Sequence, residues 1–287
     1  MNDYLLSLLL GIVEGLTEFL PVSSTAHLRI TEALLRLDLH DAFWKMYTIV
    51  IQLGAILALP VYFWNRILKF LSTFPAGERG DRNIFTHPVS LTLIAFVVTA
   101  LPAWLLTKVI GENLENLWVM AWALLIGGII MWLVDARCRN PRTQRMEEMS
   151  LPQAVWIGFA QIASAVFPGT SRSMSTIAAG QLAGLSRSAA LEFSFFLSMP
   201  TMIVATAYDL LKTLMHRGGG EANLAPLTMT GHNWVVLVIG TVVSFVVALG
   251  VVAWFMNWVR ARGFAPFAIY RIIVAGLLMW MLMRGVI

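Results

Sequence analysis

The sequence predicts an all-α polytopic membrane protein, with six transmembrane helices and two re-entrant helical hairpins arranged as an inverted-topology repeat. Of its 287 residues, 58% are hydrophobic and only 13% are charged, whereas an ordinary soluble domain carries about a quarter charged residues. The mean hydropathy is +0.75, and apolar stretches run from one end of the chain to the other. These observations exclude a water-soluble fold and predict one integral membrane domain over 1–287.

Six segments are long and apolar enough to cross a bilayer, which takes about 20 residues in a helix. They are expected near 43–64, 89–110, 116–134, 189–211, 234–258 and 265–283. The first lysine or arginine of the chain is Arg29, so the N-terminal apolar run lacks the basic start of a cleaved signal peptide. We therefore expect that run to remain in the mature protein.

Two further apolar stretches are interrupted. The interruptions are Glu14, Glu18 and Pro21 in the first stretch, and Pro168, Gly169 and Arg172 in the second. Unwound backbone at membrane depth is tolerated only inside protein or beside a water-filled cavity, so both stretches are predicted to be re-entrant hairpins. The predicted descending arm, turn and returning arm are 4–20, 21–25 and 26–36 in the first hairpin, and 152–167, 168–173 and 174–185 in the second.

The two hairpins resemble each other in sequence. The pattern Gly11-x-x-Glu14 followed by Pro21-x-Ser23-Ser24 recurs at the same spacing as Gly158-x-x-Gln161 followed by Pro168-x-Thr170-Ser171. Each half, about 1–134 and 151–287, would contain one hairpin and three spans. An odd number of crossings makes the second half start from the opposite side, which predicts an inverted repeat with both turns near the midplane.

Apart from Arg172 and Arg271, the basic residues fall on two sides of the predicted membrane. One side carries eleven, namely Arg66, Lys69, Arg79, Arg82, Arg137, Arg139, Arg142, Arg145, Arg187, Arg260 and Arg262. The other carries seven, namely Arg29, Arg36, Lys45, Lys108, Lys212, Arg217 and Arg284. Because cytoplasmic loops are enriched in Lys and Arg, the first side is expected to be cytoplasmic. The termini and the mouth of the first hairpin would then face outward.

Ionisable side chains within the predicted membrane region mark a functional site, because each costs at least about 2.5 kcal/mol to insert. Glu14 and Glu18 are four residues apart and so share one helix face. They could converge on a metal ion, a proton or a nucleophile. The alternative is an exposed helix end with two solvated carboxylates, but the flanking residues are strongly apolar.

The second turn has the composition of a phosphate site. Ser171, Arg172, Ser173 and Thr176 provide one guanidinium and several hydroxyls just before a predicted helix. Arginine offers a fixed charge and forked donors, and free N–H groups at a helix start favour anions. The alternative is a simple Ser/Thr cap at an ordinary helix start.

The first turn carries a matching polar group of Ser23, Ser24, Thr25 and His27. A hydroxyl close to a carboxylate or an imidazole is a candidate nucleophile, so Ser24 is placed in that role. His27 could be either a catalytic base or a structural hydrogen-bonding residue. The pattern itself does not decide between them.

Four further polar residues are expected to support the site. Gln52, Gln161 and Glu192 would act as supporting partners, although hydrogen bonding between helices explains such residues equally well. Arg271 lies inside the last predicted span and would need an anion nearby, unless it extends to the membrane interface.

At these residues the sequence resembles the undecaprenyl-diphosphate phosphatase family of the bacitracin-resistance type. The resemblance rests on Glu14-Gly-Leu-Thr-Glu18-Phe-Leu-Pro-Val-Ser-Ser-Thr-x-His27, Pro168-Gly-x-Ser-Arg-Ser173-x-x-Thr176, Gln52-Leu-Gly, Ser186-Arg-x-x-Ala-x-Glu192-Phe-Ser-Phe and Phe264-x-Pro-Phe-Ala-Ile-Tyr-Arg271. It covers nearly the full chain. One departure is that Met174 and Ser175 stand where the family commonly has Gly-Ala.

The resemblance implies hydrolysis of undecaprenyl diphosphate to the monophosphate in the bacterial inner membrane. This reaction recycles the lipid carrier for peptidoglycan synthesis and confers bacitracin resistance, and the site would open to the periplasm. The resemblance also implies a divalent cation, Mg²⁺ or Ca²⁺, which Glu14 and Glu18 would hold, and a possible homodimer. Nucleic acid is not an expected partner, because the basic residues lie in short loops.

The resulting hypothesis has the diphosphate bound by Arg172 and the surrounding hydroxyls, which are those of Ser23, Thr25, Ser171, Ser173 and Thr176. Ser24 would attack the terminal phosphorus while Glu18 or His27 takes its proton. Attack by water or by His27 remains open, because phosphoryl transfer depends chiefly on positioning and charge neutralisation. The alternative function is a polyprenyl-lipid transporter or flippase, which also fits an inverted repeat.

Overall fold

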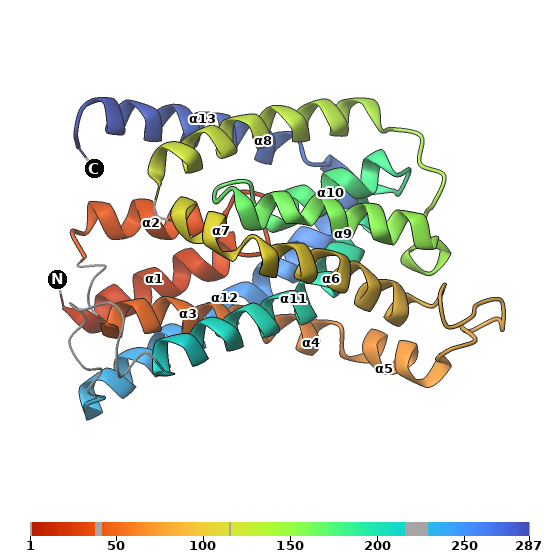
Figure 1. The fold of residues 1–287 in the computed structure, drawn as a ribbon, viewed down its shortest axis with the longest axis horizontal. Coiled ribbons are helices and arrows are strands. Elements are labelled where there is room, and N and C mark those ends of the chain that lie inside the picture. Colours follow the sequence, from red (N-terminus) through yellow and green to blue (C-terminus); the bar gives the residue numbers. More distant parts are fainter. Residues whose placement is uncertain (1, 38–41, 115, 216–228, 287) are drawn as a thin grey trace.

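The structure is a computed structural model that describes residues 2–37, 42–114, 116–215 and 229–286. Most helices lie alongside one another and form an elongated bundle, with both termini at the same end (Figure 1). The helices are α1 (Asp3–Thr17), α2 (Ser24–Leu34), α3 (Ala42–Ile56), α4 (Ala58–Tyr62), α5 (Trp64–Thr73), α6 (Pro88–Leu105), α7 (Thr107–Asn113), α8 (Leu117–Arg137), η1 (Met146–Glu148), α9 (Leu151–Val166), α10 (Arg172–Leu182), α11 (Arg187–Met215), α12 (Gly231–Arg262) and α13 (Ala265–Met283).

Six helical segments in the described ranges are long and apolar enough to cross a membrane, which confirms the predicted number. They are Phe43–Tyr62, Pro88–Leu105, Leu117–Arg137, Arg187–Leu211, Gly231–Arg262 and Ala265–Met283. The first of them is interrupted between α3 and α4, because the ring of Pro60 clashes with the carbonyl of Ile56 four residues earlier. The second is shorter than predicted, since α6 ends at Leu105 and α7 begins at Thr107.

The two predicted hairpins are present as pairs of helices, α1 with α2 and α9 with α10 (Figure 1). These helices have 15, 11, 16 and 11 residues, fewer than the roughly 20 needed to span a bilayer. Their turns are displaced from the prediction, because α2 already begins at Ser24 and α10 at Arg172. That the hairpins are re-entrant, and that the halves form an inverted repeat, stay predictions.

Glycines allow each hairpin to approach a long helix closely. α1 lies along α12, and a Cβ on Gly11 would stand 2.8 Å from the carbonyl oxygen of Gly240. In the same way α9 lies along α6, and a Cβ on Gly158 would stand 2.5 Å from the carbonyl oxygen of Ala95. Real Cβ atoms do not approach so closely, so both contacts require glycine.

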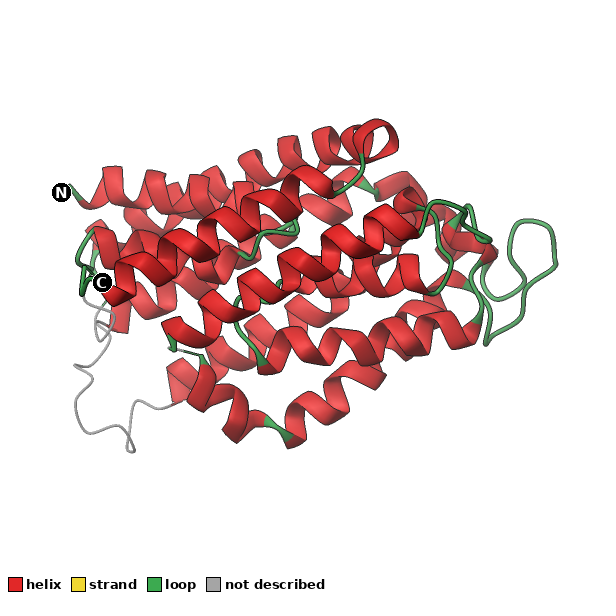
Figure 2. Cartoon of the chain, turned by 90° about the horizontal axis from the view of Figure 1, so that it is seen from above, coloured by secondary structure: helices red, strands yellow, loops and turns green. Residues whose placement is uncertain are grey.

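α8 and α13 pack side by side at one edge of the bundle (Figure 1). Seen from above, the described part of the chain consists of helices joined by loops and turns (Figure 2). A core of apolar side chains from α3, α4, α10, α11, α12 and α13 fills the centre, including Phe195, Phe255 and Phe267. This packing holds α13 beside both hairpin turns.

Basic residues predicted on the cytoplasmic side gather at one end of the molecule. Arg139, Arg187 and Arg260 line one cavity there, and Arg79, Arg82 and Arg145 line another. Of the opposite group, Arg217 lies outside the described residues. Which end faces the cytoplasm stays a prediction.

Candidate active site

A carboxylate, a hydroxyl and a guanidinium meet where the two turns touch. Glu18, directly after the last residue of α1, accepts a hydrogen bond from the Ser24 hydroxyl at 2.5 Å. Its other oxygen forms a salt bridge with Arg172 Nη2 at 3.1 Å. The side chains of this ion pair are only 6% and 13% exposed. Glu18 therefore links the hydroxyl of the first turn to the guanidinium of the second.

Local backbone geometry places these groups. Ser23 and Ser171 each have a positive φ, 74° and 71°, and each caps the following helix by accepting a backbone hydrogen bond. The chain can therefore reverse within a few residues, so that Ser24 and Arg172 are the first residues of α2 and α10. A positive φ is unusual for serine and indicates that the surrounding packing holds both turns in place.

Glu14 lies one turn before Glu18 on α1 and is fully buried. In the described part of the chain, neither of its carboxylate oxygens has a hydrogen-bond partner. Its charge interacts with those of Glu18 and Arg172. A buried carboxylate without a partner is costly, so Glu14 requires a proton or a cation at this position.

Arg172 has one hydrogen-bond donor group that is unpaired within the described residues. Its Nη1 atom is buried and has no hydrogen-bond partner among the described residues, while Nη2 holds Glu18. A guanidinium with one edge paired and the other free can bind an additional anion, such as a phosphate oxygen.

The other hydroxyls of the second turn are engaged within the protein. The Ser173 hydroxyl donates to the carbonyl of Leu20 and lies 3.0 Å from the hydroxyl of Ser171. Thr176 is fully buried and contacts the Ser194 hydroxyl at 2.7 Å. These bonds tie α10 to the first turn and to α11, and binding of phosphate by the three side chains stays a prediction.

His27 is hydrogen-bonded at both ring nitrogens. Nδ1 lies 2.7 Å from the carbonyl oxygen of Ser23, and Nε2 lies 2.7 Å from the hydroxyl of Tyr270. Because a carbonyl only accepts, Nδ1 carries the proton, and Nε2 of the neutral ring accepts from Tyr270. The imidazole also stacks on the Tyr270 ring. In this geometry Glu18, and not His27, is bonded to Ser24.

Arg271 is fully buried and joins the two turns. Its guanidinium donates to the carbonyls of Pro21 at 3.1 Å and Gly169 at 3.0 Å, and to that of Ala123 in α8 at 3.1 Å. Gly127 leaves the space for it, since a Cβ there would stand 2.3 Å from Nη2. Arg271 thus does not extend to the interface, and among the described residues its Nη atoms bind three carbonyl oxygens and no carboxylate, while its buried Nε has no partner there.

The remaining residues predicted for the site do not hydrogen-bond to Glu18, Ser24 or Arg172 within the described part of the chain. Gln161 is buried on α9 and donates to the Thr201 hydroxyl at 3.2 Å. Glu192 forms an ion pair with Arg66 at 2.7 Å, and Arg66 also binds Glu147. Glu192 therefore belongs to an ionic cluster between α5, η1 and α11. Thr25 and Gln52 are half-buried, and neither hydrogen-bonds to the site within the described residues.

Comparison with known proteins gives the family. The model of the family described as "Bacitracin resistance protein BacA" matches residues 7–277. The chain belongs to this family. A protein of Koribacter versatilis (strain Ellin345) named undecaprenyl-diphosphatase is 63% identical over 99% of this chain and its own full length. Proteins of the same name from Rhizobium etli (strain CIAT 652) and Deinococcus radiodurans are 40% and 37% identical, covering 99% of this chain and 99% and 97% of their own lengths.

Two residues of this BacA-family site were missed from the sequence. Tyr270 holds His27, and Ser194 contacts Thr176. Both lie inside the motifs that carry the family resemblance, Tyr270 directly before Arg271 and Ser194 two residues after Glu192. Their position in those motifs was the available signal, but their partners are more than 15 residues away along the chain.

Proposed function

We propose that this protein is an undecaprenyl-diphosphate phosphatase of the bacterial inner membrane. The observation that carries the proposal is the Ser24–Glu18–Arg172 arrangement, in which one carboxylate contacts both a hydroxyl and a guanidinium. The hydroxyl is a nucleophile beside a base, and the guanidinium is an anion site beside that nucleophile. Relatives of matching length carry the name of this activity.

In the proposed reaction, Arg172 binds the terminal phosphate through its free Nη1 edge. Ser24 Oγ attacks the terminal phosphorus while its proton passes to Glu18, the acceptor of its hydrogen bond. The bond from that phosphorus to the bridging oxygen breaks, which releases undecaprenyl phosphate and leaves a phosphoserine. Water then attacks the phosphoserine and releases inorganic phosphate, and the Ser24 oxygen regains a proton.

His27 and Arg271 position the site in this scheme. Arg271 fixes both turns through the carbonyls of Pro21 and Gly169, and His27 braces the first turn against α13 through Tyr270. Phosphoryl transfer is accelerated chiefly by positioning and charge neutralisation. The contact between the two turns holds the reacting groups in position and places the positive charge of Arg172 beside the proposed nucleophile.

The donor set suits a divalent cation such as Mg²⁺ or Ca²⁺. Glu14 offers two buried oxygens without partners, next to Glu18. Three or more His, Cys, Asp or Glu side chains do not converge anywhere in the described ranges, so substrate phosphate oxygens would complete the shell, as is usual for Mg²⁺. Glu14 and Glu18 would hold the ion, which supplies neutralisation of the diphosphate charge when bound.

Ser24 and His27 are half-buried in the first turn of α2, and α2 runs from there toward the end of the bundle that carries both termini (Figure 1). With the basic end in the cytoplasm, the site opens to the periplasm, where recycling of the carrier for peptidoglycan synthesis begins. The same activity would confer bacitracin resistance, in line with the description of the family. The proposal includes re-entrant hairpins related by an inverted repeat and is compatible with a homodimer.

Phosphate release from undecaprenyl diphosphate by the purified protein tests this proposal. Arg172→Ala is expected to lower kcat/KM by about 10³-fold or more, and Glu18→Gln by about 10²-fold to 10⁴-fold. Arg142→Ala and Glu78→Gln remove the same types of charge from exposed positions and should hydrolyse at the wild-type rate. If Arg172→Ala and Glu18→Gln also do so, the proposed site is wrong.

The nucleophile is tested separately with substrate labelled in the terminal phosphate. Wild-type protein quenched in acid should retain label on Ser24, and Ser24→Ala should retain none and lose activity. Activity of Ser24→Ala close to that of the wild type would instead assign the attack to water or to His27.

A further inference from the structure

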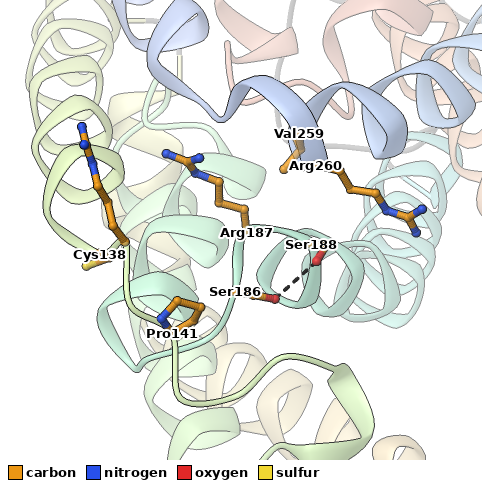
Figure 3. Close-up of a pocket in the computed structure, with 8 residues that line it drawn as sticks. Cys138, Pro141, Ser186, Arg187, Ser188, Val259 and Arg260 are labelled. Atoms are coloured by element: carbon orange, nitrogen blue, oxygen red, sulfur yellow. Dashed lines mark hydrogen bonds between the residues drawn. The ribbon is translucent and has the colours of Figure 1, made fainter.

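The cavity lined by Arg139, Arg187 and Arg260 lies away from the two turns, at the end of the bundle opposite the termini. It has a volume of about 540 Å³, within the range of small-ligand pockets. Its lining includes Arg139, Arg187, Arg260, Ser186, Ser188 and Val259. Figure 3 shows that Ser186, Arg187 and Ser188 come from the start of α11, while Val259 and Arg260 come from the end of α12.

This cavity is separate from the candidate active site. The two are linked through α11, where Ser194 contacts Thr176 of the second turn. Ser194 follows Ser186 by eight residues, or about 12 Å along a helix that rises 1.5 Å per residue. None of the residues assigned to hydrolysis lines the cavity.

The cavity has an excess of positive charge. Three of its lining residues are arginines and none is acidic. Arg187 is neutralised by the neighbouring Asp135. Arg139 and Arg260 are exposed and form no ion pair with any residue that the structure describes. Two guanidinium groups therefore remain available to an anionic ligand.

Arg187 is held in a fixed position. Its Nε donates to Asp135 Oδ1 at 2.6 Å, and the backbone N–H of Phe264 donates to Oδ2 of the same carboxylate. Gly263 has a φ of 71°, and a Cβ there would stand 2.7 Å from Arg187 Cζ. The chain between α12 and α13 thus provides the space that this side chain occupies.

The start of α11 adds hydrogen-bond donors to the same cavity. Ser186 Oγ donates to the Gln144 carbonyl at 2.9 Å and accepts from the Ala189 N–H, so of the two hydroxyls it is that of Ser188, 3.3 Å away, that can donate to a ligand (Figure 3). Because the first backbone bond of the helix is donated by Ala190 to Ser186, the N–H groups of Arg187 and Ser188 have no intrahelical partner. Such N–H groups favour a phosphate.

We propose that this cavity binds a phosphate group, either the headgroup of an anionic phospholipid or inorganic phosphate. Forked guanidinium donors, hydroxyls and helix-start N–H groups are the chemistry that recognises phosphate. The cavity lies where three candidate spans end or begin, at Arg137, Arg187 and Arg262. That level corresponds to the membrane interface, where basic pockets between helices bind anionic headgroups.

Binding is tested on the full chain in detergent with three probes, namely short-chain phosphatidylglycerol, phosphatidylcholine of the same chain length, and inorganic phosphate. Affinity is read from the rise in Tm and from bound lipid in native mass spectra. Phosphatidylglycerol is expected to bind more tightly than phosphatidylcholine. The double variant Arg139→Gln/Arg260→Gln should weaken it about 30-fold, since each arginine contributes about a factor of five.

Two controls separate this site from general surface charge and from the active site. Arg79→Gln/Arg137→Gln removes two exposed arginines from the same end that do not line the cavity and should bind like the wild type. Arg139→Lys/Arg260→Lys should retain most of the affinity. Arg172→Ala should leave phosphatidylglycerol binding unchanged, since Arg172 belongs to the other site.

The outcomes are distinct. Selective loss in Arg139→Gln/Arg260→Gln supports the site, and competition by inorganic phosphate then decides whether free phosphate is also a ligand. The proposal is overturned if neither phosphatidylglycerol nor phosphate binds. It is also overturned if the Arg79→Gln/Arg137→Gln control weakens binding equally, or if Arg172→Ala abolishes it.

Discussion

The first and second hairpins share their packing but differ in their chemistry. Gly11 and Gly158 each press against a long helix, and a serine with positive φ caps the returning helix in each. The first hairpin carries the two carboxylates and Ser24, the proposed nucleophile, whereas the second carries Arg172. At equivalent positions, three residues after the glycine, the first has Glu14 and the second Gln161.

The difference shows that two hairpins with similar packing can bring opposite charges together at one place. The packing glycine and the capping serine are common to both hairpins, whereas the charged side chains proposed to bind substrate or metal differ between them. A buried carboxylate is costly without a counter-charge, and Arg172 from the second hairpin provides one for Glu18 in the first. Each hairpin therefore supplies the counter-charge for a buried charge in the other.

Among the variants that test this comparison, the exchanges at Glu14 and Gln161 should have the largest effects. Glu14→Gln makes the first hairpin like the second and is expected to lower kcat by about 100-fold, because it removes a group that tunes Glu18 or holds a cation. Gln161→Glu makes the reverse change and should mainly lower stability, since it buries an unpaired carboxylate. Steady-state hydrolysis and Tm measured on both variants separate the two effects.

Two results would contradict that expectation. If Glu14→Gln retains full activity, the two positions are chemically equivalent and the asymmetry lies elsewhere. If Gln161→Glu loses activity as severely as Glu14→Gln without a fall in Tm, Gln161 acts in the reaction itself.

The packing glycines should respond alike in both hairpins, with a smaller effect. Gly11→Ala and Gly158→Ala force a Cβ against a backbone carbonyl and should each destabilise the protein by about 1–3 kcal/mol. Gly250→Ala on α12, where a Cβ would meet open space, serves as the control and should be neutral or slightly stabilising. A neutral result in only one hairpin would show that the two contacts are not equivalent.

The capping serines should show the smallest effect. Ser23→Gly and Ser171→Gly relieve the positive φ but lose a side-chain cap, so each should change stability by less than about 1 kcal/mol. Asn116→Gly is the matched control, because Asn116 caps α8 with an ordinary φ of −82° and gains no such relief. If all three variants lower Tm equally, the positive φ values carry no strain.

The sequence alone predicted the six spans and both hairpins, because long apolar runs and their interruptions are local features. The span predicted over 265–283 matches Ala265–Met283. The break after Ile56 was missed, although Pro60 was its signal. The equal spacing of the two motifs did not reveal that the helix caps lie at different positions. The capping serine Ser23 follows Gly11 by 12 residues, whereas the capping serine Ser171 follows Gly158 by 13.

Long-range partners could not be predicted, because they depend on how helices pack. A buried arginine in a span suggested a nearby anion, yet Arg271 binds carbonyl oxygens that only the folded turns present. Glu192 lies in a family motif and was expected near the site, but α11 places it against Arg66. In both cases the residue type was informative and the identity of its partner was not.

Arg271 also limits how the two halves of the molecule can move. One side chain contacts the first turn, the second turn and α8 at once, and hydrogen bonds from a charged donor contribute about 1.5–3 kcal/mol each. A rocking motion that carries lipid across the bilayer would have to detach this guanidinium from at least one carbonyl and find it a substitute acceptor. With that anchor in place, both turns and α8 stay together, and substrate would have to come to a proposed site of fixed geometry.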